Sequence, residues 1–285
     1  MEAIMAIKLV TDSTSDIPKD LAEKLGITVV PLRVNFGDES FLDGVELKIE
    51  DFYPKLAASK ELPSTSQVNP GEFIEVFNEL LDQGDEVIGV FIAKELSGTY
   101  SSAKIAKDTI GSEKIHLIDS RGVTTMISLM LMEAAKMIEE GKNVEEIIQK
   151  VETMTGAMKS AFIIDTLKYL VKGGRLSKTQ GAAGSLLNVK PIIKVENGVV
   201  ETIHKARGSA KAIKWLVDFV KEGGYSLENK TVFIVNSNAP ELGLKIEEAL
   251  KEHFSIKEVI HTQIGAVVGT HAGPGCGGIV FCALD

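Results

Sequence analysis

The sequence predicts an α/β fold in two parts, and three observations carry this prediction. Over residues 1–156, short apolar runs alternate with amphipathic stretches of helical period, as in parallel βαβ units. Over residues 157–285, an Asn-Gly pair at 197–198 lies between two apolar runs, which predicts a hairpin. The pattern changes near residues 155–156. We therefore expect an open parallel-sheet, Rossmann-like domain, followed by an α+β domain with a largely antiparallel sheet.

The elements expected in the first part follow from apolar runs and from caps. Residues 4–10, 27–34, 87–93 and 114–118 are short, rich in β-branched side chains and nearly uncharged, so we expect buried strands. Residues 49–58, 71–83, 100–108, 124–138 and 143–154 show helical spacing. Residues 36–46 predict a hairpin-like or irregular excursion, with a turn at Gly37-Asp38. Residues 62–70 predict a loop, because two prolines exclude a helix across them.

The elements expected in the second part are six strands and two helices. The strands are residues 161–164, 191–195, 199–204, 231–235, 258–263 and 279–283. The helices are residues 210–221 and 241–253. Mixing hairpins with helices in this way predicts that the second sheet is mostly antiparallel.

Three polar turns are expected at one edge of the parallel sheet. Residues 12–15, 97–99 and 119–120 each follow an expected strand, and the carboxyl ends of parallel strands share one edge. In the sequence Leu96-Ser97-Gly98-Thr99, the strand leads into a helix whose first N–H groups are free. Such a turn binds an anion with help from its hydroxyls. It is equally consistent with an ordinary helix cap.

Composition excludes several classes of protein. The formal net charge of −9 argues against non-specific nucleic-acid binding, which needs a basic face. Two cysteines give neither a disulfide framework nor a Cys₄ metal site, which fits a reducing, cytoplasmic environment. We expect no signal peptide. The apolar stretch 123–138 contains Glu133 and Lys136 and is too short to span a membrane, so we expect at most peripheral membrane contact.

Known catalytic signatures are also missing from the sequence. No Walker A, G-x-S-x-G or HExxH motif is present, and the five histidines have no metal-ligand spacing. The Gly-rich segment 273–278 precedes a strand instead of opening a helix, so it does not fit a dinucleotide site. We therefore expect no metal and no cofactor.

The stretch 124–138 is apolar on nearly every face of the expected helix. A helix of this kind is buried on all sides, which fits an ordinary core helix. Four of the eight methionines lie in it, and methionine adapts well to an irregular apolar partner. The alternative is the wall of a channel for a long apolar ligand, formed by Met126, Ile127, Met130 and Leu131.

Three charged or titratable residues have two interpretations each. His271 lies in a Gly-rich segment that we expect to be a flexible loop, where a histidine can bind a ligand or be solvated. Arg175 and Arg207 each adjoin glycine, so that backbone could approach while the guanidinium binds an oxyanion. Each arginine alone also fits a solvated surface residue.

Five motifs together resemble the DegV family, the fatty-acid-binding (FakB-type) subunits of bacterial fatty acid kinase. The motifs occur in the family's order and extend over nearly the whole chain. They are DSTSDIP at residues 12–18, PSTSQV at 63–68, LSGTY at 96–100, KGGRLS at 172–177 and THAGPG at 270–275.

The resemblance implies a two-domain α/β protein that holds one long-chain fatty acid, such as palmitate, stearate or oleate, in a buried tunnel. It implies that Thr65, Ser97 and Gly98 meet the carboxylate, with His271 near the head group. Arg175, Arg207 and His271 would present the head group to the catalytic subunit of a fatty acid kinase. In this light the channel-wall interpretation of the helix 124–138 is favoured.

The expected function is therefore that of a lipid carrier without catalytic residues of its own. Hydroxyls at a helix N-terminus hold a carboxylate moderately, which suits an acid that must later accept phosphate. Two alternatives belong to other classes. One is a stand-alone acyl hydrolase or transferase that uses Ser97 and His271, although no nucleophile elbow supports it. The other is a lipid sensor that reports to another partner.

Overall fold

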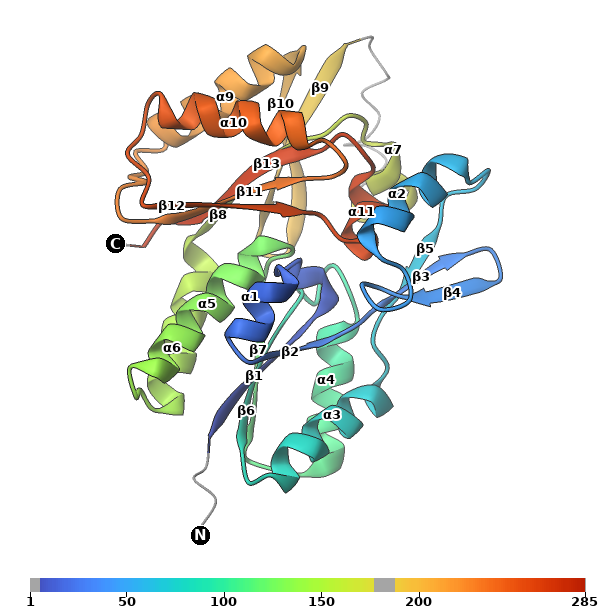
Figure 1. The fold of residues 1–285 in the computed structure, drawn as a ribbon, viewed down its shortest axis with the longest axis vertical. Helices are drawn as coiled ribbons and strands as arrows, with labels where there is room; N and C mark the ends of the chain where they lie inside the picture. Colours follow the sequence, from blue (N-terminus) through green and yellow to red (C-terminus); the bar gives the residue numbers. More distant parts are fainter. Residues whose placement is uncertain (1–5, 177–187, 285) are drawn as a thin grey trace.

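The first sheet of the computed structural model has four parallel strands in the order β2-β1-β6-β7 (Figure 1). The structure describes residues 6–176 and 188–284, so residues 4 and 5 of the first expected strand lie outside it. The strands are β1 (Ile7–Asp12), β2 (Ile27–Val30), β6 (Glu86–Phe91) and β7 (Ile115–Asp119). All three pairings are parallel, which confirms the expected open sheet.

Helices cover both faces of this sheet. Helices α3 (Pro70–Asp82) and α4 (Thr99–Ile110) pack together on one face. Helices α1 (Lys19–Lys24), α5 (Thr125–Glu139) and α6 (Val144–Ala157) lie on the other. Both α3 and α6 begin with a capping box, in which an asparagine and a glutamate satisfy the first free N–H groups.

The second sheet has six strands in the order β10-β9-β8-β13-β11-β12. Its strands are β8 (Met158–Ile163), β9 (Val189–Glu196), β10 (Val199–Arg207), β11 (Thr231–Asn236), β12 (Glu258–Gln263) and β13 (Gly277–Cys282). Only the β11–β12 pair is parallel, so the expectation of a largely antiparallel sheet is confirmed. Helices α9 (Ser209–Glu222) and α10 (Pro240–Lys251) cover its outer face.

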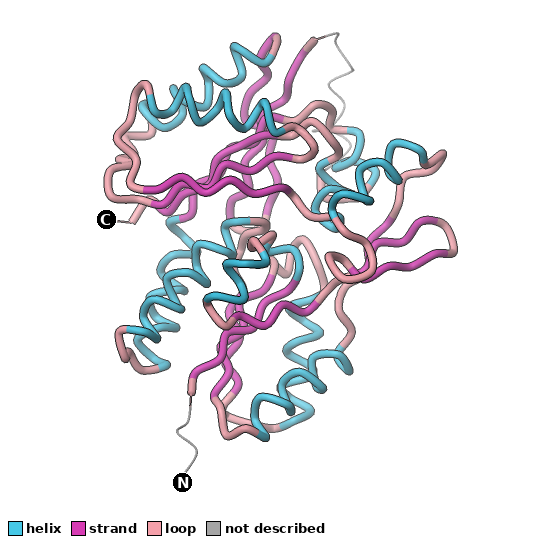
Figure 2. Tube along the Cα trace, viewed as in Figure 1, coloured by secondary structure: helices cyan, strands magenta, loops and turns pink. Residues whose placement is uncertain are grey.

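Helix α5 lies between the two sheets, as Figure 2 shows. It contacts β1 and β6 of the first sheet and β8, β11 and β13 of the second. One continuous hydrophobic cluster joins the inner faces of both sheets through this helix. Helix α5 is therefore apolar on nearly every face because it is buried against a sheet on both sides.

A small third sheet corrects two predictions from the sequence. The expected strand 27–34 is two strands in two sheets, because the chain leaves β2 at Pro31 and begins β3 (Arg33–Phe36). Strand β3 pairs with β4 (Glu39–Leu42), as the expected hairpin requires, and also with β5 (Ser64–Ser66). The segment 62–70 therefore contains a strand where a loop was expected. Helix α2 (Ile49–Ala58) lies between β4 and β5 in the chain.

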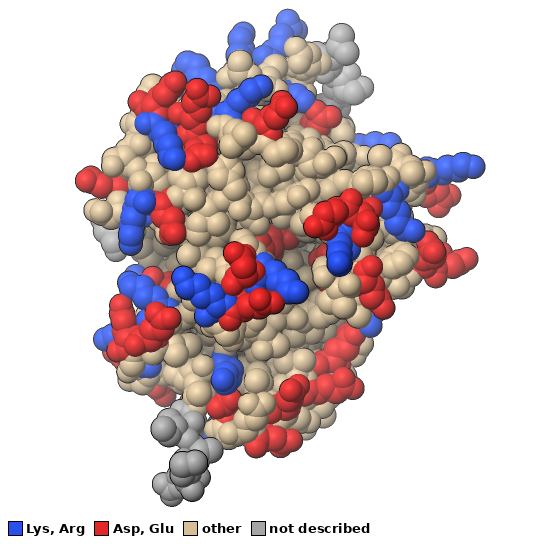
Figure 3. Space-filling model, in the orientation of Figure 1, with Lys and Arg blue, Asp and Glu red and all other residues tan. Residues whose placement is uncertain are grey.

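The surface carries charges of both signs. On the face in Figure 3, lysine and arginine side chains are interspersed with aspartate and glutamate. Within the described residues, no helix is both long enough and apolar enough to cross a membrane.

Candidate functional site

A largely apolar cavity lies where the two sheets meet, and we call it the inner cavity. It encloses about 710 Å³ of empty space when the open solvent at its mouth is included. Six of the described lining side chains are polar, namely Thr14, Thr65, Ser97, Thr124, Arg175 and His271. The others are apolar and come from both halves of the chain.

The carboxyl-end edge of the parallel sheet forms one side of the inner cavity. Thr14 follows β1 in the short 3₁₀ helix η1 (Ser13–Ser15), Ser97 follows β6, and Thr124 follows β7. This is the edge at which open α/β sheets bind ligands. The expected gathering of the turns on one edge is therefore found. The residues that reach the cavity after β7 lie a few positions beyond residues 119–120.

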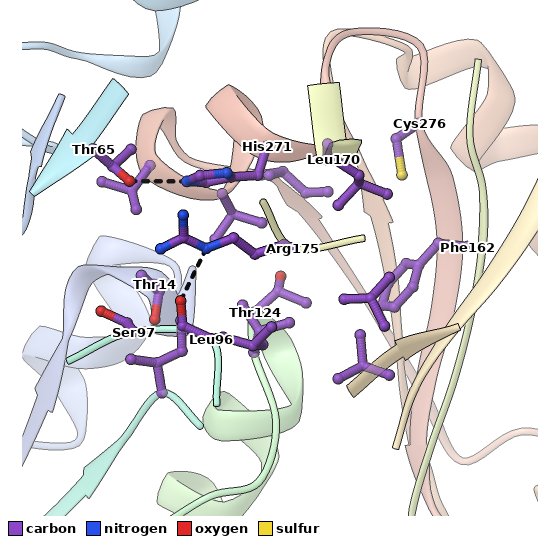
Figure 4. Close-up of a pocket in the computed structure, with 18 of the residues that line it drawn as sticks. Thr14, Thr65, Leu96, Ser97, Thr124, Phe162, Leu170, Arg175, His271 and Cys276 are labelled. Carbon is purple, nitrogen blue, oxygen red and sulfur yellow. Dashed lines mark hydrogen bonds between the residues drawn. The ribbon is translucent and has the colours of Figure 1, made fainter. Parts of the chain in front are cut away.

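The polar side chains collect at one end of the inner cavity (Figure 4). Thr65 comes from the small sheet, where strand β5 turns its side chain inward and leaves Ser64 and Ser66 exposed. His271 comes from α11 (Ala266–Ala272), a short helix where the sequence predicted a flexible loop. Thr65 Oγ1 and His271 Nε2 are 2.8 Å apart and share a hydrogen bond.

The His271 imidazole is neutral at neutral pH. Burial, with a smaller contribution from the Arg175 guanidinium, lowers its pKa to about 4. Its Nδ1 is buried and has no hydrogen-bond partner among the described residues. The ring can thus donate or accept a hydrogen bond without bringing a charge into the apolar cavity.

Arg175 is held at the mouth of the inner cavity by two carbonyl groups. Its Nε donates to Leu96 O at 3.0 Å and its Nη1 donates to Gly173 O at 2.6 Å. A Cβ atom at residue 173 would lie 2.2 Å from His271 Nδ1, so only glycine fits there. Gly174 has φ of +74°, a conformation that favours glycine. The two glycines of the KGGR motif are therefore required for different reasons, close packing at Gly173 and a positive φ at Gly174.

Ser97 lies just before α4, and Gly98 is the N-cap residue of that helix. Ser97 Oγ is 2.9 Å from Thr99 Oγ1 and accepts a hydrogen bond from Thr99 N at 3.3 Å. Gly98 is not among the residues that line the inner cavity. A Cβ atom at residue 98 would lie 1.9 Å from Gln67 Oε1. Gly98 thus allows Gln67 to pack over the helix start.

Two further hydroxyls at the inner cavity were not selected from the sequence. Thr124 has φ of +53°, a conformation rare for a β-branched residue, and its buried Oγ1 has no partner among the described residues. Its N–H donates to Thr14 O at 2.8 Å. Thr14 Oγ1 donates to the buried carboxylate of Asp12. Thr14 lies within the DSTSDIP motif, whereas no sequence pattern marks Thr124.

The opposite end of the inner cavity is apolar and belongs mainly to the second sheet. Figure 4 shows Phe162 and Cys276 at this end, away from His271 and Thr65. Further apolar walls come from β8, β9 and β10 and from the segment that leads into α11; they include Ile164, Ile193, Val195, Val200 and Ile264.

Besides Gly98, five candidate residues do not line the inner cavity; four of them were expected to form the channel wall, and that placement is corrected. Met126, Ile127, Met130 and Leu131 are buried in the core between the sheets, so α5 reaches the cavity only through the preceding Val123 and Thr124. Arg207 is exposed at the end of β10.

The arrangement does not form a hydrolytic triad from Ser97 and His271. Ser97 Oγ is paired with Thr99, and His271 Nε2 is paired with Thr65. No carboxylate of the described residues bonds the His271 ring, as the orienting acid of a triad would. The described residues also contain no group of three or more His, Cys, Asp or Glu side chains that could hold a metal ion.

The fold and site define an α/β protein with two main sheets, a small third sheet, and a cavity that is polar at one end and apolar at the other. The chain belongs to the DegV family. A family model described as "Uncharacterised protein, DegV family" matches residues 6–284.

Relatives and solved structures agree with this assignment over nearly the full length. A DegV domain-containing protein of Caldanaerobacter subterraneus is 42% identical over 275 residues, covering 96% of this chain and 98% of the relative. A Thermus thermophilus DegV family protein, described as binding fatty acid, superimposes with a TM-score of 0.92 at 31% identity, covering 98% and 100% of the two chains. DegV of Bacillus subtilis, described as a fatty acid binding protein, gives 0.86 at 34% identity, covering 99% and 100%.

Proposed function

We propose that this chain binds one long-chain fatty acid, such as palmitate, stearate or oleate, in the inner cavity. The observation that carries the proposal is the polarity of the cavity, with hydroxyls and a neutral imidazole at one end and apolar side chains at the other. Two solved relatives are described as fatty-acid-binding proteins, which supports the same ligand class here.

The polar end suits a carboxylate that must stay reactive. Thr65, Ser97 and Thr124 offer hydroxyls, and His271 offers a neutral ring nitrogen. Arg175 is the one charged side chain among the described lining residues, and two carbonyl groups already hold its guanidinium. Neutral donors stabilise a carboxylate less than an ion pair would, which leaves its oxygen available as a nucleophile.

The apolar end supplies most of the binding free energy. Each methylene group moved from water into an apolar site contributes about 0.8 kcal/mol. A chain of about sixteen carbons therefore gains several kcal/mol from this end even after the ordering of the chain is subtracted. The lining from β8, β9 and β10 is the wall that we assign to the acyl chain.

Native mass spectrometry of the purified chain tests the ligand. The expected result is a one-to-one complex with fatty acids of about sixteen to eighteen carbons, either co-purified or after addition. A protein that stays free of ligand in the presence of excess palmitate, stearate and oleate would overturn the proposal.

We further propose that the bound carboxylate is presented to the catalytic subunit of a fatty acid kinase, which forms an acyl phosphate from ATP. Arg175 and His271 stand at the mouth, and the exposed Arg207 is available to a partner. Because Arg207 lies outside the inner cavity, Arg207→Ala should reduce acyl-phosphate formation about tenfold and leave palmitate affinity within twofold. Unchanged acyl-phosphate formation, or an equal loss in both assays, would exclude this role for Arg207.

A further inference from the structure

A cleft separate from the inner cavity lies between the two halves of the chain, and we call it the side cleft. It encloses about 1570 Å³ of empty space when the open solvent at its mouth is included. Helices α5 and α6 form one wall, and residues at the start of β11 and β12 and at the end of β13 form the other. The inner cavity lies at the opposite ends of β12 and β13, where Ile264 and Cys276 line it. The two sites share no described residue.

The side cleft has more positive than negative side chains, although the whole chain carries a formal charge of −9. Its charged lining residues, among those that the structure describes, are Lys136, Lys150, Lys230, Lys257, Glu133 and Glu228. Lys136 and Lys230 have partners in the described structure. Lys150 and Lys257 form no hydrogen bond and no ion pair with any described residue. Two lysines without a counter-ion favour an anionic ligand.

Lysines from different elements approach the same part of the side cleft, next to Cys282. Burial raises the pKa of the Cys282 thiol, and the positive charges of Lys230 and Lys150 offset part of this effect. Lys150 belongs to α6, whereas Lys230 immediately precedes β11. Ammonium groups that converge from two sides form charge-assisted hydrogen bonds with the oxygens of a phosphate group.

Apolar side chains line another part of the side cleft. Leu129 and Met132 come from α5, Met154 comes from α6, and Leu284 follows β13. Leu129 and Met154 are buried, while Met132 and Leu284 are half-buried. Methionine sulfur makes favourable contacts with aromatic rings. An anion that carries a flat aromatic ring therefore matches both the lysines and the methionines of this cleft.

We propose that the side cleft binds a nucleoside phosphate, with its phosphate groups at the lysines and its base against the two methionines. The Glu228 carboxylate and the Asn229 amide, which also line the cleft, can accept hydrogen bonds from the sugar hydroxyls. The chain has no Walker A motif, so side chains and not a phosphate-binding loop would hold the phosphates. The inference does not depend on the proposed function, because the fatty acid and the nucleotide would occupy different sites.

Calorimetry on the full chain with ADP, in the absence of divalent metal ions, tests the ligand. ADP should bind, and Lys150→Ala and Lys257→Ala should each weaken its binding about tenfold. Both variants should keep palmitate affinity within twofold of wild type. Lys245→Ala is the matched control, because Lys245 is exposed on α10 and lines neither the side cleft nor the inner cavity. Absence of ADP binding, or an equal effect of Lys245→Ala, would overturn the inference.

Modification of Cys282 shows where ADP binds. Cys282 is half-buried and lines the side cleft, whereas Cys276 is 1% exposed, so N-ethylmaleimide should modify Cys282 first. Saturating ADP should slow this modification several-fold, as measured by mass spectrometry. An unchanged rate would place ADP outside the side cleft and would contradict the inference.

The two parts of the nucleotide can be tested separately. Adenosine lacks the phosphates and inorganic phosphate lacks the base, so each alone should bind at least about tenfold more weakly than ADP. If inorganic phosphate binds as tightly as ADP, the base makes no contribution and the cleft does not select a nucleoside phosphate. Palmitate binding in the same preparation tests the proposed function independently of all these outcomes.

Discussion

Thr65 and His271 are separated by 206 positions in the sequence, yet their side chains are hydrogen-bonded. The contact requires both the small sheet, which directs Thr65 inward, and α11, which places His271 in its last turn. The donor in this bond depends on the tautomer of the imidazole. Either tautomer leaves the other ring nitrogen near Gly173, where backbone and ring are in close contact.

Loss of the Thr65 hydroxyl should weaken fatty acid binding. In Thr65→Ala, a buried head group loses one donor, which corresponds to about 1–1.5 kcal/mol or a five- to tenfold rise in Kd. Displacement of a fluorescent fatty acid measures this change. Ser66→Ala is the control, because Ser66 lies next in β5, is exposed and pairs with Asn35. Equal effects of the two substitutions would show that Thr65 does not contact the head group.

Single residues were predictable where a motif marks them. Thr65, Ser97, Arg175 and His271 were selected through short motifs, and the structure brings all four to one cavity. Thr124 was missed, since nothing in its sequence context reveals a positive φ or an unpaired hydroxyl. The positive φ and the unpaired hydroxyl of Thr124 both depend on tertiary contacts, which a local sequence pattern does not reveal.

At the scale of elements, long periodic segments were predicted well and short ones were not. The four strands of the parallel sheet and helices α3, α5 and α6 follow from local patterns. Strand β5 has three residues and is formed by pairing with β3, a non-local contact that the flanking Pro63 and Pro70 obscure. Helix α11 is rich in glycine and small residues, so its local preference for helix is weak.

The hydrophobic pattern of helix α5 predicts that the helix is buried but does not identify what it packs against. An apolar helix surface contacts a ligand or another part of the protein equally well. The second sheet supplies the partner here, and its packing against α5 could not be read from residues 124–138 alone.

The end of α7 (Lys168–Lys172) and the end of α11 constrain each other through Gly173. In Gly173→Ala, the added methyl group would overlap the His271 ring, so we expect at least a tenfold loss of palmitate affinity. The control is Gly174→Asn, since asparagine tolerates the positive φ of residue 174 and nothing lies near its Cβ. Isothermal calorimetry compares the two variants. Normal palmitate affinity in Gly173→Ala would show that the position of His271 does not matter for binding.

At the scale of the whole molecule, buried carboxyl groups connect the two halves. Asp16 Oδ1 accepts a hydrogen bond from Gly265 N at 2.9 Å, and Asp43 Oδ1 accepts one from Ala266 N at 3.1 Å. Burial raises the pKa of Asp16 to about 8 and that of Asp43 to about 6. Asp12 lies in the same cluster, and burial raises its pKa as well. Asp16 and Asp43 hold the start of α11, the helix that carries His271.

Asp16 should make the protein less stable as pH rises from about 4 to about 8. Its folded pKa lies above the unfolded value, so its contribution is complete below pH 4 and is lost as pH rises through the folded pKa. Asp16→Asn keeps an oxygen for Gly265 N but does not titrate. Between pH 5 and pH 8, its unfolding free energy should gain more than about 1.4 kcal/mol relative to wild type.

Urea unfolding at the two pH values measures this difference. Asp20→Asn is the control, because Asp20 is exposed in α1. A pH dependence of Asp16→Asn equal to that of wild type and the control would show that Asp16 does not hold a proton in the folded state.

The hydrophobic cluster that runs through α5 has a consequence for how the chain unfolds. Because the inner faces of both sheets share it, separating the halves near residue 156 would expose much of the core of each. The boundary near residue 156 therefore separates two sheets of different topology but does not separate two parts that are stable on their own. We expect a single cooperative unfolding transition in which both sheets unfold together. A ligand that fills the cavity at their junction would raise the midpoint of that single unfolding transition and would stabilise both halves of the molecule together.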